Sequence, residues 1–170
     1  ISFSLQGIYG IQVGDPVTVS DGVSTKDHVV ASLTVTGVDP ATDTVWGTAD
    51  AGSEITVWTH DGGAHLQVMA DGFGDWSADL SGQVNLEPGW GGGAAVHDDD
   101  QDSTAVHWSI PNPSFTARPD HDQVDGWEWQ PDSSVTVTIN GDSWTAVTDE
   151  GGNFGLSLDG FDLQAGDLVS

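Results

Sequence analysis

The side chains best suited to chemistry are carboxylates that gather in three predicted turns. The densest group is the run Asp98-Asp99-Asp100-Gln101-Asp102, and two shorter turns span Asp50 to Glu54 and Asp71 to Asp75. Ca²⁺ is a hard cation that takes about six to eight oxygen ligands in flexible geometry. If successive strands alternate in direction, all three turns fall at one end of a domain. They form a candidate calcium site of Asp50, Glu54, Asp71, Asp75, Asp98, Asp99, Asp100 and Asp102.

A solvated acidic loop is the alternative interpretation of the same residues. The spacing differs from that of an EF-hand loop, which needs Gly at its sixth position and Glu at its twelfth. The sequence leaves both interpretations open. A bound calcium ion at this end of the domain would stiffen the joint to the unit that precedes it.

The overall charge restricts the partners. The chain carries 27 acidic residues against only Lys26 and Arg118, which gives a formal net charge of −25. Such a surface repels phosphate, so nucleic acid and anionic membranes are poor partners, and we expect neither nucleic-acid binding nor membrane insertion. A high Asp content also suits an extracellular medium and keeps long arrays from sticking together.

Histidine supplies a second, weaker group of candidate ligands. His60 and His65 flank a predicted hairpin turn, and His97 and His107 lie on neighbouring predicted strands. A zinc or copper site built from either pair is conceivable. Outward-facing histidines with no ligand are the commoner arrangement on strands.

Tryptophan supplies a third group. Trp76 and Trp108 are in phase with the core positions of their strands and are predicted to pack inside. Four others fall out of phase with the apolar face, two of them by the repeat alignment, and exposed indoles can stack on sugar rings. A carbohydrate-binding surface, or a surface that covers a neighbouring unit or subunit, is therefore predicted at Trp46, Trp58, Trp127 and Trp129.

Signatures of catalysis and of membrane insertion are missing. The sequence has no Gly-x-Ser-x-Gly, no phosphate-binding loop and no His-Glu-x-x-His, so we expect no enzyme activity. It has no cysteine, and hence no disulfide or cysteine-bound zinc. No apolar run reaches the roughly 18–20 residues of a spanning helix. The sequence starts at Ile1 with no basic and apolar leader. We therefore expect either that a leader was removed or that the sequence is a window from a longer chain.

The elements that position these residues are predicted to be short strands separated by turns. From Val45 to Leu80, apolar residues alternate at period two, and Gly- and Asp-rich turns interrupt them. No segment shows a helical period over a useful length. Strands of this length and spacing predict antiparallel β-sandwiches of about seven strands each.

An internal repeat sets the predicted domains. Val124 follows Val45 by 79 residues, and the segments around Ser134 and Asp149 repeat those around Glu54 and Asp71 at a similar offset. Residues 157–167 also match residues 4–15. We therefore expect the last strands of one unit in 1–32, a complete unit in 33–110, a stiff Pro-rich linker in 111–113 and the first strands of a further unit in 114–170.

Two stretches carry a resemblance to a known family. Val45-Trp-Gly-Thr-Ala-Asp-Ala-Gly-Ser-Glu-Ile-Thr-Val, followed by Ala70-Asp-Gly-Phe-Gly-Asp-Trp-Ser, resembles the bacterial Ig-like repeats of large secreted adhesins and cell-surface proteins. The second unit departs from the pattern, with Gly126-Trp-Glu-Trp in place of Gly-Thr-Ala and Phe154 in place of Trp76. The resemblance implies tandem Ig-like sandwiches at the cell surface, and it implies no catalytic residues.

The predicted role is therefore that of a non-catalytic extracellular spacer, stalk or surface filament. Its expected partners are neighbouring Ig-like units of the same chain or of identical chains. Because an incomplete sandwich exposes a sheet edge, identical chains could assemble head to tail by strand donation. A carbohydrate-binding module that uses the exposed tryptophans is the alternative.

Overall fold

The computed structural model describes residues 7–170, and these residues form strands and loops with no helix. None of them therefore belongs to a helix long and apolar enough to cross a membrane. Of the strands expected in 1–32, residues 1–6 lie outside the described residues. The strands are β1 (Pro16–Ser20), β2 (Thr25–Val29), β3 (Leu33–Asp39), β4 (Thr44–Ala49), β5 (Glu54–Thr59), β6 (His65–Met69), β7 (Asp75–Asp79), β8 (Gly91–His97), β9 (Ser103–Ser109), β10 (Ser114–Arg118), β11 (Gln123–Trp127), β12 (Ser134–Ile139), β13 (Asp142–Val147) and β14 (Phe154–Ser157).

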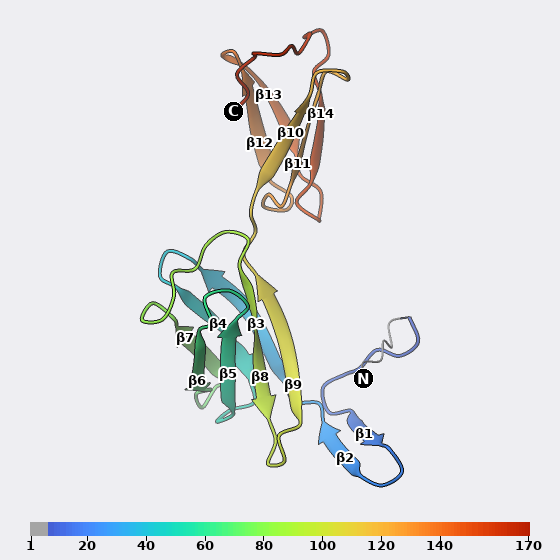
Figure 1. The fold of residues 1–170 in the computed structure, drawn as a ribbon, viewed down its shortest axis with the longest axis vertical. Coiled ribbons are helices and arrows are strands. Elements are labelled where there is room, and N and C mark those ends of the chain that lie inside the picture. The colour runs from blue at the N-terminus through green and yellow to red at the C-terminus, as the bar shows by residue number, and fades with distance from the viewer. Residues whose placement is uncertain (1–6) are drawn as a thin grey trace. The chain divides into compact units, whose positions relative to one another are not determined.

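The chain divides into two compact units, 1–110 and 111–170. In the first unit, β3, β4 and β7 form one antiparallel sheet, and β6, β5, β8 and β9 form another in that spatial order (Figure 1). The hairpin of β1 and β2 is a separate two-stranded sheet. In the second unit, the sheets are β10-β11-β14 and β12-β13.

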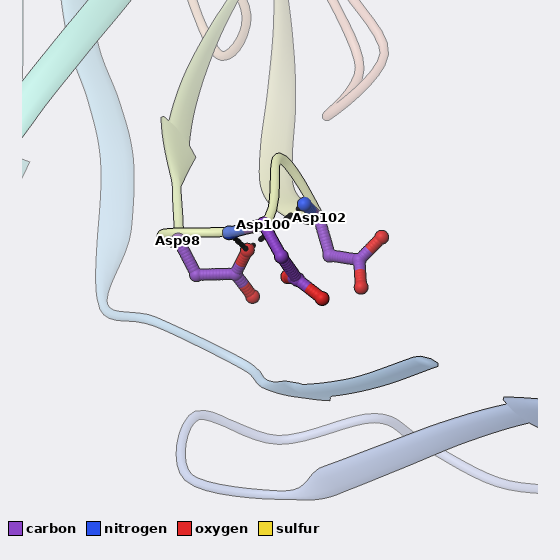
Figure 2. Close-up of side chains that lie close together, drawn as sticks. All are labelled: Asp98, Asp100 and Asp102. Atoms are coloured by element: carbon purple, nitrogen blue, oxygen red, sulfur yellow. Dashed lines mark hydrogen bonds between the residues drawn. The ribbon is translucent and has the colours of Figure 1, made fainter. Parts of the chain in front are cut away.

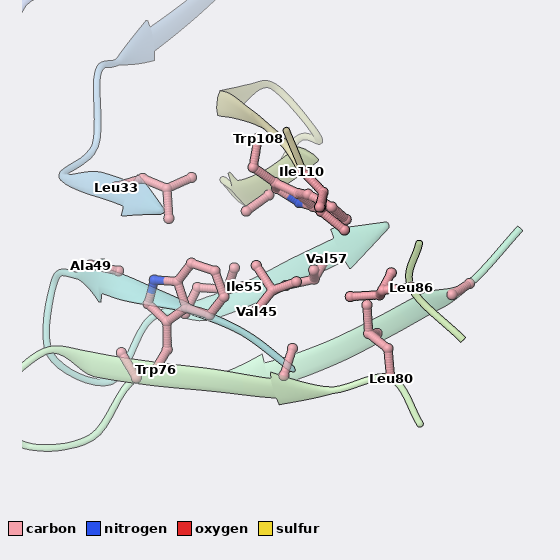
Figure 3. Packing of buried hydrophobic residues seen from close by; sticks show 14 residues of the cluster. Leu33, Val45, Ala49, Ile55, Val57, Trp76, Leu80, Leu86, Trp108 and Ile110 are labelled. Atoms are coloured by element: carbon pink, nitrogen blue, oxygen red, sulfur yellow. The ribbon is translucent and has the colours of Figure 1, made fainter. Parts of the chain in front are cut away.

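The period-two pattern explains which side chains enter the core of the first unit. Along β4, Val45 and Ala49 are buried while Trp46 between them is exposed, because successive side chains of a strand point to opposite faces. The two larger sheets contribute to one hydrophobic cluster, which contains Ile55, Trp76 and Trp108 (Figure 3). Both tryptophans predicted to be internal are thus buried.

Aromatic rings lie directly over glycines of neighbouring strands, and this relationship recurs through the fold. A Cβ added to Gly93 would lie 2.3 Å from Trp58 Cζ2, and one added to Gly37 would lie 2.2 Å from Trp46 Cζ2. Such distances leave no room for a side chain, so glycine is required at these positions. The recurring pairs are Trp46–Gly37, Trp58–Gly93, Trp76–Gly47, Trp108–Gly92 and Phe154–Gly126.

One turn-and-strand arrangement occurs in three places. It begins with a four-residue turn, in which the main-chain N–H of the fourth residue donates to the main-chain oxygen of the first. The three turns are 12–15, 87–90 and 164–167. Gly14 and Asp15 then exchange hydrogen bonds with Val30 as Gly89 and Trp90 do with Ile110. The hairpin β1–β2 is therefore built like β8–β9, and Leu168–Ser170 lies along β12 as the start of β8 lies along β5.

The β4–β5, β6–β7 and β8–β9 turns of the first unit lie at the same end of their sheets. The N–H of Gly52 donates to Ala70 O, and the N–H of Ala49 donates to Gly74 O, which joins the first two turns. Ile55 pairs with Val96, which brings the β8–β9 turn beside them. This end is called the acidic pole below, and its carboxylates come from residues 50–54, 71–75 and 98–102.

Candidate functional site

Three five-residue turns share one architecture, in which the first residue is aspartate. In the β8–β9 turn, Oδ1 of Asp98 accepts hydrogen bonds from the N–H groups of Asp100 and Asp102, at 3.3 and 2.9 Å. The corresponding carboxylate oxygens of Asp71 and Asp149 accept from the N–H groups two and four residues later in the same way. These aspartates thus shape their turns, and that role is independent of any metal ion.

The fourth residue of this turn adopts a left-handed backbone conformation. Glycine fills the position twice, as Gly74 with φ of 89° and Gly152 with φ of 75°. In the β8–β9 turn the position is taken by Gln101, with φ of 72°. A side chain in this region is strained, because its Cβ crowds the backbone.

Asp98, Asp100 and Asp102 bring their carboxylates together at the tip of the β8–β9 turn. One oxygen from each lies within 4.8 Å of the others. Their side chains project toward the hairpin of β1 and β2 (Figure 2). Among residues 7–170, this is the one cluster of three or more such groups close enough to share a metal ion.

Two basic side chains of β2 face these carboxylates. Lys26 Nζ lies 2.6 Å from Asp100 Oδ2 and 3.3 Å from Asp102 Oδ2, and it donates to Asp100 O at 2.9 Å. His28 Nδ1 lies 2.7 Å from Asp98 Oδ2, and its Nε2 lies 2.9 Å from Thr104 Oγ1. The ammonium group of Lys26 thus occupies the place in which a metal ion would bind the oxygens of Asp100 and Asp102.

The electrostatics follow from these contacts. The hydrogen bond from His28, with those from the turn's own N–H groups, lowers the pKa of Asp98 to about 2. The hydrogen bond to Asp100 raises the pKa of Lys26, although partial desolvation opposes the shift. The ion pair of Lys26 and Asp100 is thus stabilised in its charged form, as expected for opposite charges in contact.

The remaining predicted calcium ligands lie at the acidic pole but outside the cluster. Oδ2 of Asp50 accepts from the N–H of Ser32 at 3.3 Å, and Oε1 of Glu54 accepts from Gln67 Nε2 at 3.0 Å. Asp71 shapes its own turn. Asp75 and Asp99 do not join the converging carboxylates. The structure therefore brings together three of the eight predicted residues: Asp98, Asp100 and Asp102.

Sequence reasoning missed Lys26 and His28. A signal was present, since Lys26 is the single lysine of a chain with 27 acidic residues. A lysine among so many carboxylates is expected to have a carboxylate partner, but the sequence does not say which one.

The four tryptophans of the predicted glycan surface do not form one platform. Trp46 and Trp58 lie on the outer faces of different sheets, each over a glycine. Trp127 belongs to the second unit and is 39% exposed. Trp129 contacts Phe154 edge to face and donates its indole N–H to Ser114 O at 2.9 Å, so packing engages it.

The histidines pair differently from the expectation. His97 is opposite Ser103 and His107 is opposite Gly93, so these two histidines lie near opposite ends of the β8–β9 ladder. The structure instead places the rings of His60 and His107 side by side, with centroids 5.8 Å apart.

Comparisons with known proteins give little further information. No protein-family model and no curated protein matches this chain. One solved structure, described as "Ca2+-stabilized adhesin helps an Antarctic bacterium reach out and bind ice", aligns with a TM-score of 0.33 and 17% identity. The alignment covers 84% of this chain and 47% of that one, so the chain spans about half of its length. A similarity of this size carries no argument about function.

Proposed function

We propose that this chain is a non-catalytic structural segment of a cell-surface array of tandem Ig-like β-sandwiches, in which each unit spaces and orients the next. This proposal rests on the four-residue turn that 12–15, 87–90 and 164–167 share, with the same main-chain hydrogen bond from residue four to residue one. Residues 12–30 and 87–110 also share the pair of main-chain hydrogen bonds that follows the turn. A chain that builds the same strand-entry turn three times is organised as repeats. Under this proposal, 33–110 is one whole unit, and the flanking residues belong to its neighbours.

The contact between β2 and the acidic pole supplies the joint between successive units. Ala31 N–H donates to Thr104 Oγ1 at 2.9 Å, and Thr104 Oγ1 also contacts His28. Together with the ion pairs of Lys26 and the hydrogen bond between His28 and Asp98, this contact holds the segment that enters β3. A joint held by several polar contacts restricts bending, which is what a spacer requires.

The surface location is tested with an antibody against residues 33–110 on intact, unpermeabilised cells of the source organism. We expect strong labelling. Deletion of residues 33–110 from the parent protein should also bring its outer end closer to the cell surface. Labelling that appears only after the cells are opened would contradict it.

Calcium at the acidic pole is part of the proposal. Asp100 and Asp102 provide carboxylate oxygens, the ligand type that Ca²⁺ prefers, and Asp98 lies beside them. Lys26 would have to withdraw its ammonium group for the ion to approach, so the two cations compete. Solvent would supply the other ligands.

Calorimetric titration of Ca²⁺ into wild type and Lys26→Gln tests this competition. We expect tighter binding by the variant and a thermal midpoint that falls when chelator is added. No heat in either protein, with unchanged melting, would contradict calcium binding and leave the array proposal in place.

Identical chains are proposed as further partners, through the edge of β12. The N–H of Thr138 pairs with Ser170 O, but within the part of the chain that the structure describes Thr136 pairs only with β13. Its counterpart Thr56, 80 residues earlier, is buried between two strands, whereas Thr136 is exposed. Phe115, beside this edge, is 44% exposed and lines an apolar groove with Val135. An unpaired edge above such a groove readily accepts another strand.

A further inference from the structure

The outer face of the four-stranded sheet brings together aromatic side chains of β5 and β9. Trp58 on β5 is paired with Gly93 on β8, and Gly93 is paired with His107 on β9. The N–H of His60, two residues after Trp58, donates to Gly91 O at 2.8 Å. Because Gly91 and Gly93 have no side chains, nothing from β8 separates the groups on β5 from those on β9.

Two imidazole rings, one from each side of β8, lie beside each other on this face. The centroids of His60 and His107 are 5.8 Å apart, with the ring planes inclined by 44°. A metal ion bound at about 2.0–2.1 Å from an imidazole nitrogen lies roughly 3.2 Å from the ring centroid. Two imidazoles on one ion therefore have centroids roughly 4.5–6.4 Å apart, for N–metal–N angles of about 90–180°. The observed separation falls within this range.

The surroundings favour a cation at this point. Both histidines are exposed, so their rings can turn a nitrogen toward a shared ion. The formal net charge of −25 raises the local concentration of divalent cations around the whole molecule. The chain has no cysteine, and imidazole is the ligand that suits Zn²⁺, Cu²⁺ and Ni²⁺ better than it suits Ca²⁺.

We propose that His60 and His107 form a two-histidine site for a divalent transition-metal ion on the outer face of the β6-β5-β8-β9 sheet. Within residues 7–170, no third His, Cys, Asp or Glu joins the pair, so water completes the coordination. The site is separate from the acidic pole, because Gly91 and His97 are the two ends of β8 and Asp98 follows His97. It also differs in chemistry, since nitrogen ligands select against calcium.

Trp58 provides an internal reporter. Its ring contacts that of His107 edge to face, with centroids 6.4 Å apart. Paramagnetic Cu²⁺ or Ni²⁺ held at His107 lies close enough to this indole to quench its fluorescence. The quenched fraction should disappear in Trp58→Phe, although that variant keeps both histidines.

The test is calorimetric titration of NiCl₂, CuCl₂ and ZnCl₂ into the tag-free 170-residue chain, with tryptophan fluorescence recorded in parallel. We expect one site, and at least a tenfold loss of affinity in His60→Gln and in His107→Gln. His65→Gln is the matched control, because His65 lies opposite Trp58 on the other neighbouring strand and should bind as wild type does. Circular dichroism checks that each variant is folded. No binding by the wild type, or equal affinity in His60→Gln and His65→Gln, would overturn the proposal.

Discussion

The ammonium group of Lys26 contacts both the carboxylate and the main-chain oxygen of Asp100, at 2.6 and 2.9 Å, across 74 residues of sequence. This contact joins the β1–β2 hairpin to the acidic pole of the sheets that follow. Because both side chains are about half exposed, salt screens the attraction. The attachment of the hairpin to the acidic pole should therefore weaken as the ionic strength rises.

Loss of this ion pair should loosen the hairpin while the sheets stay intact. In Lys26→Gln we expect severalfold faster amide exchange along β1 and β2, with unchanged protection along β5 and β8, since the core has no part in the contact. Hydrogen exchange measured by mass spectrometry reads out both regions. Arg118→Gln, which removes the ion pair with Asp125 in the other unit, is the control and should leave β1 and β2 unchanged.

Replacement of Gln101 by glycine should stabilise the first unit. Gln101 takes the left-handed position that Gly74 and Gly152 fill in the two matching turns. Relief of this strain is worth about 1 kcal/mol, less the extra entropy that glycine gives the unfolded chain. Denaturant melts should show a higher midpoint. The opposite change, Gly152→Ala, should destabilise, because its Cβ would lie 2.1 Å from Trp129 O. A lower midpoint for Gln101→Gly would contradict the strain argument.

The aromatic rings over glycines predict a dependence between paired positions. Gly93→Ala should destabilise by about 1–3 kcal/mol, because the new methyl group overlaps the Trp58 ring. Trp58→Ala should remove most of that penalty, so the two changes are far from additive in a double-mutant cycle. Gly47→Ala should cost more, since its Cβ would lie 1.9 Å from the main-chain oxygen of Thr34, which has little freedom to move. Additive effects at positions 58 and 93 would show that the ring and the glycine are independent.

Acid should weaken the contact between Asp98 and His28 only at very low pH. The pKa of Asp98 is lowered to about 2 by its hydrogen bonds, below the ordinary value of about 3.9. A carboxylate with a lowered pKa contributes stability that is complete above its unfolded pKa and is lost as the pH falls through about 2. Asp98→Asn keeps an oxygen that can accept from the turn but removes the charge. Its thermal midpoint should lie below that of the wild type at pH 6 and approach it near pH 2. A difference that stays constant with pH would contradict the assignment.

The edge of β12 at Thr136, which no strand among residues 7–170 covers, predicts self-association that a proline can block. Repulsion between chains of charge −25 should be screened at high ionic strength, where sedimentation should reveal concentration-dependent oligomers. Thr136→Pro removes the N–H that faces the open edge and should leave monomers. Thr145→Pro is the matched control, because Thr145 pairs with Thr136 and carries its N–H toward the opposite edge. Monomers in the wild type at every concentration would exclude assembly through this edge.

The alternation around Val45 was sufficient to predict strands, turns and the all-β class, because the side-chain period of a strand is a local property. That alternation placed Trp76 inside, and the matching alternation of Val106, Trp108 and Ile110 placed Trp108 inside. The contact between Lys26 and Asp100 could not be predicted from the sequence, since it depends on the orientation of a hairpin relative to a distant turn. The covering of Gly93 by Trp58 and the pairing of His60 with His107 both depend on strand order, which local alternation does not specify.

The scarcity of basic residues makes this chain a poor substrate for one class of protease. Trypsin-like enzymes cut after lysine or arginine, and the chain offers only Lys26 and Arg118, the second of which is followed by Pro119, which blocks cleavage. Lys26 lies within β2, paired with Val19, and its side chain is held by Asp100. A protease needs its substrate extended and unpaired over several residues. Digestion by such an enzyme therefore waits for the hairpin to open, and the rate of a single cleavage at Lys26 measures how often it does.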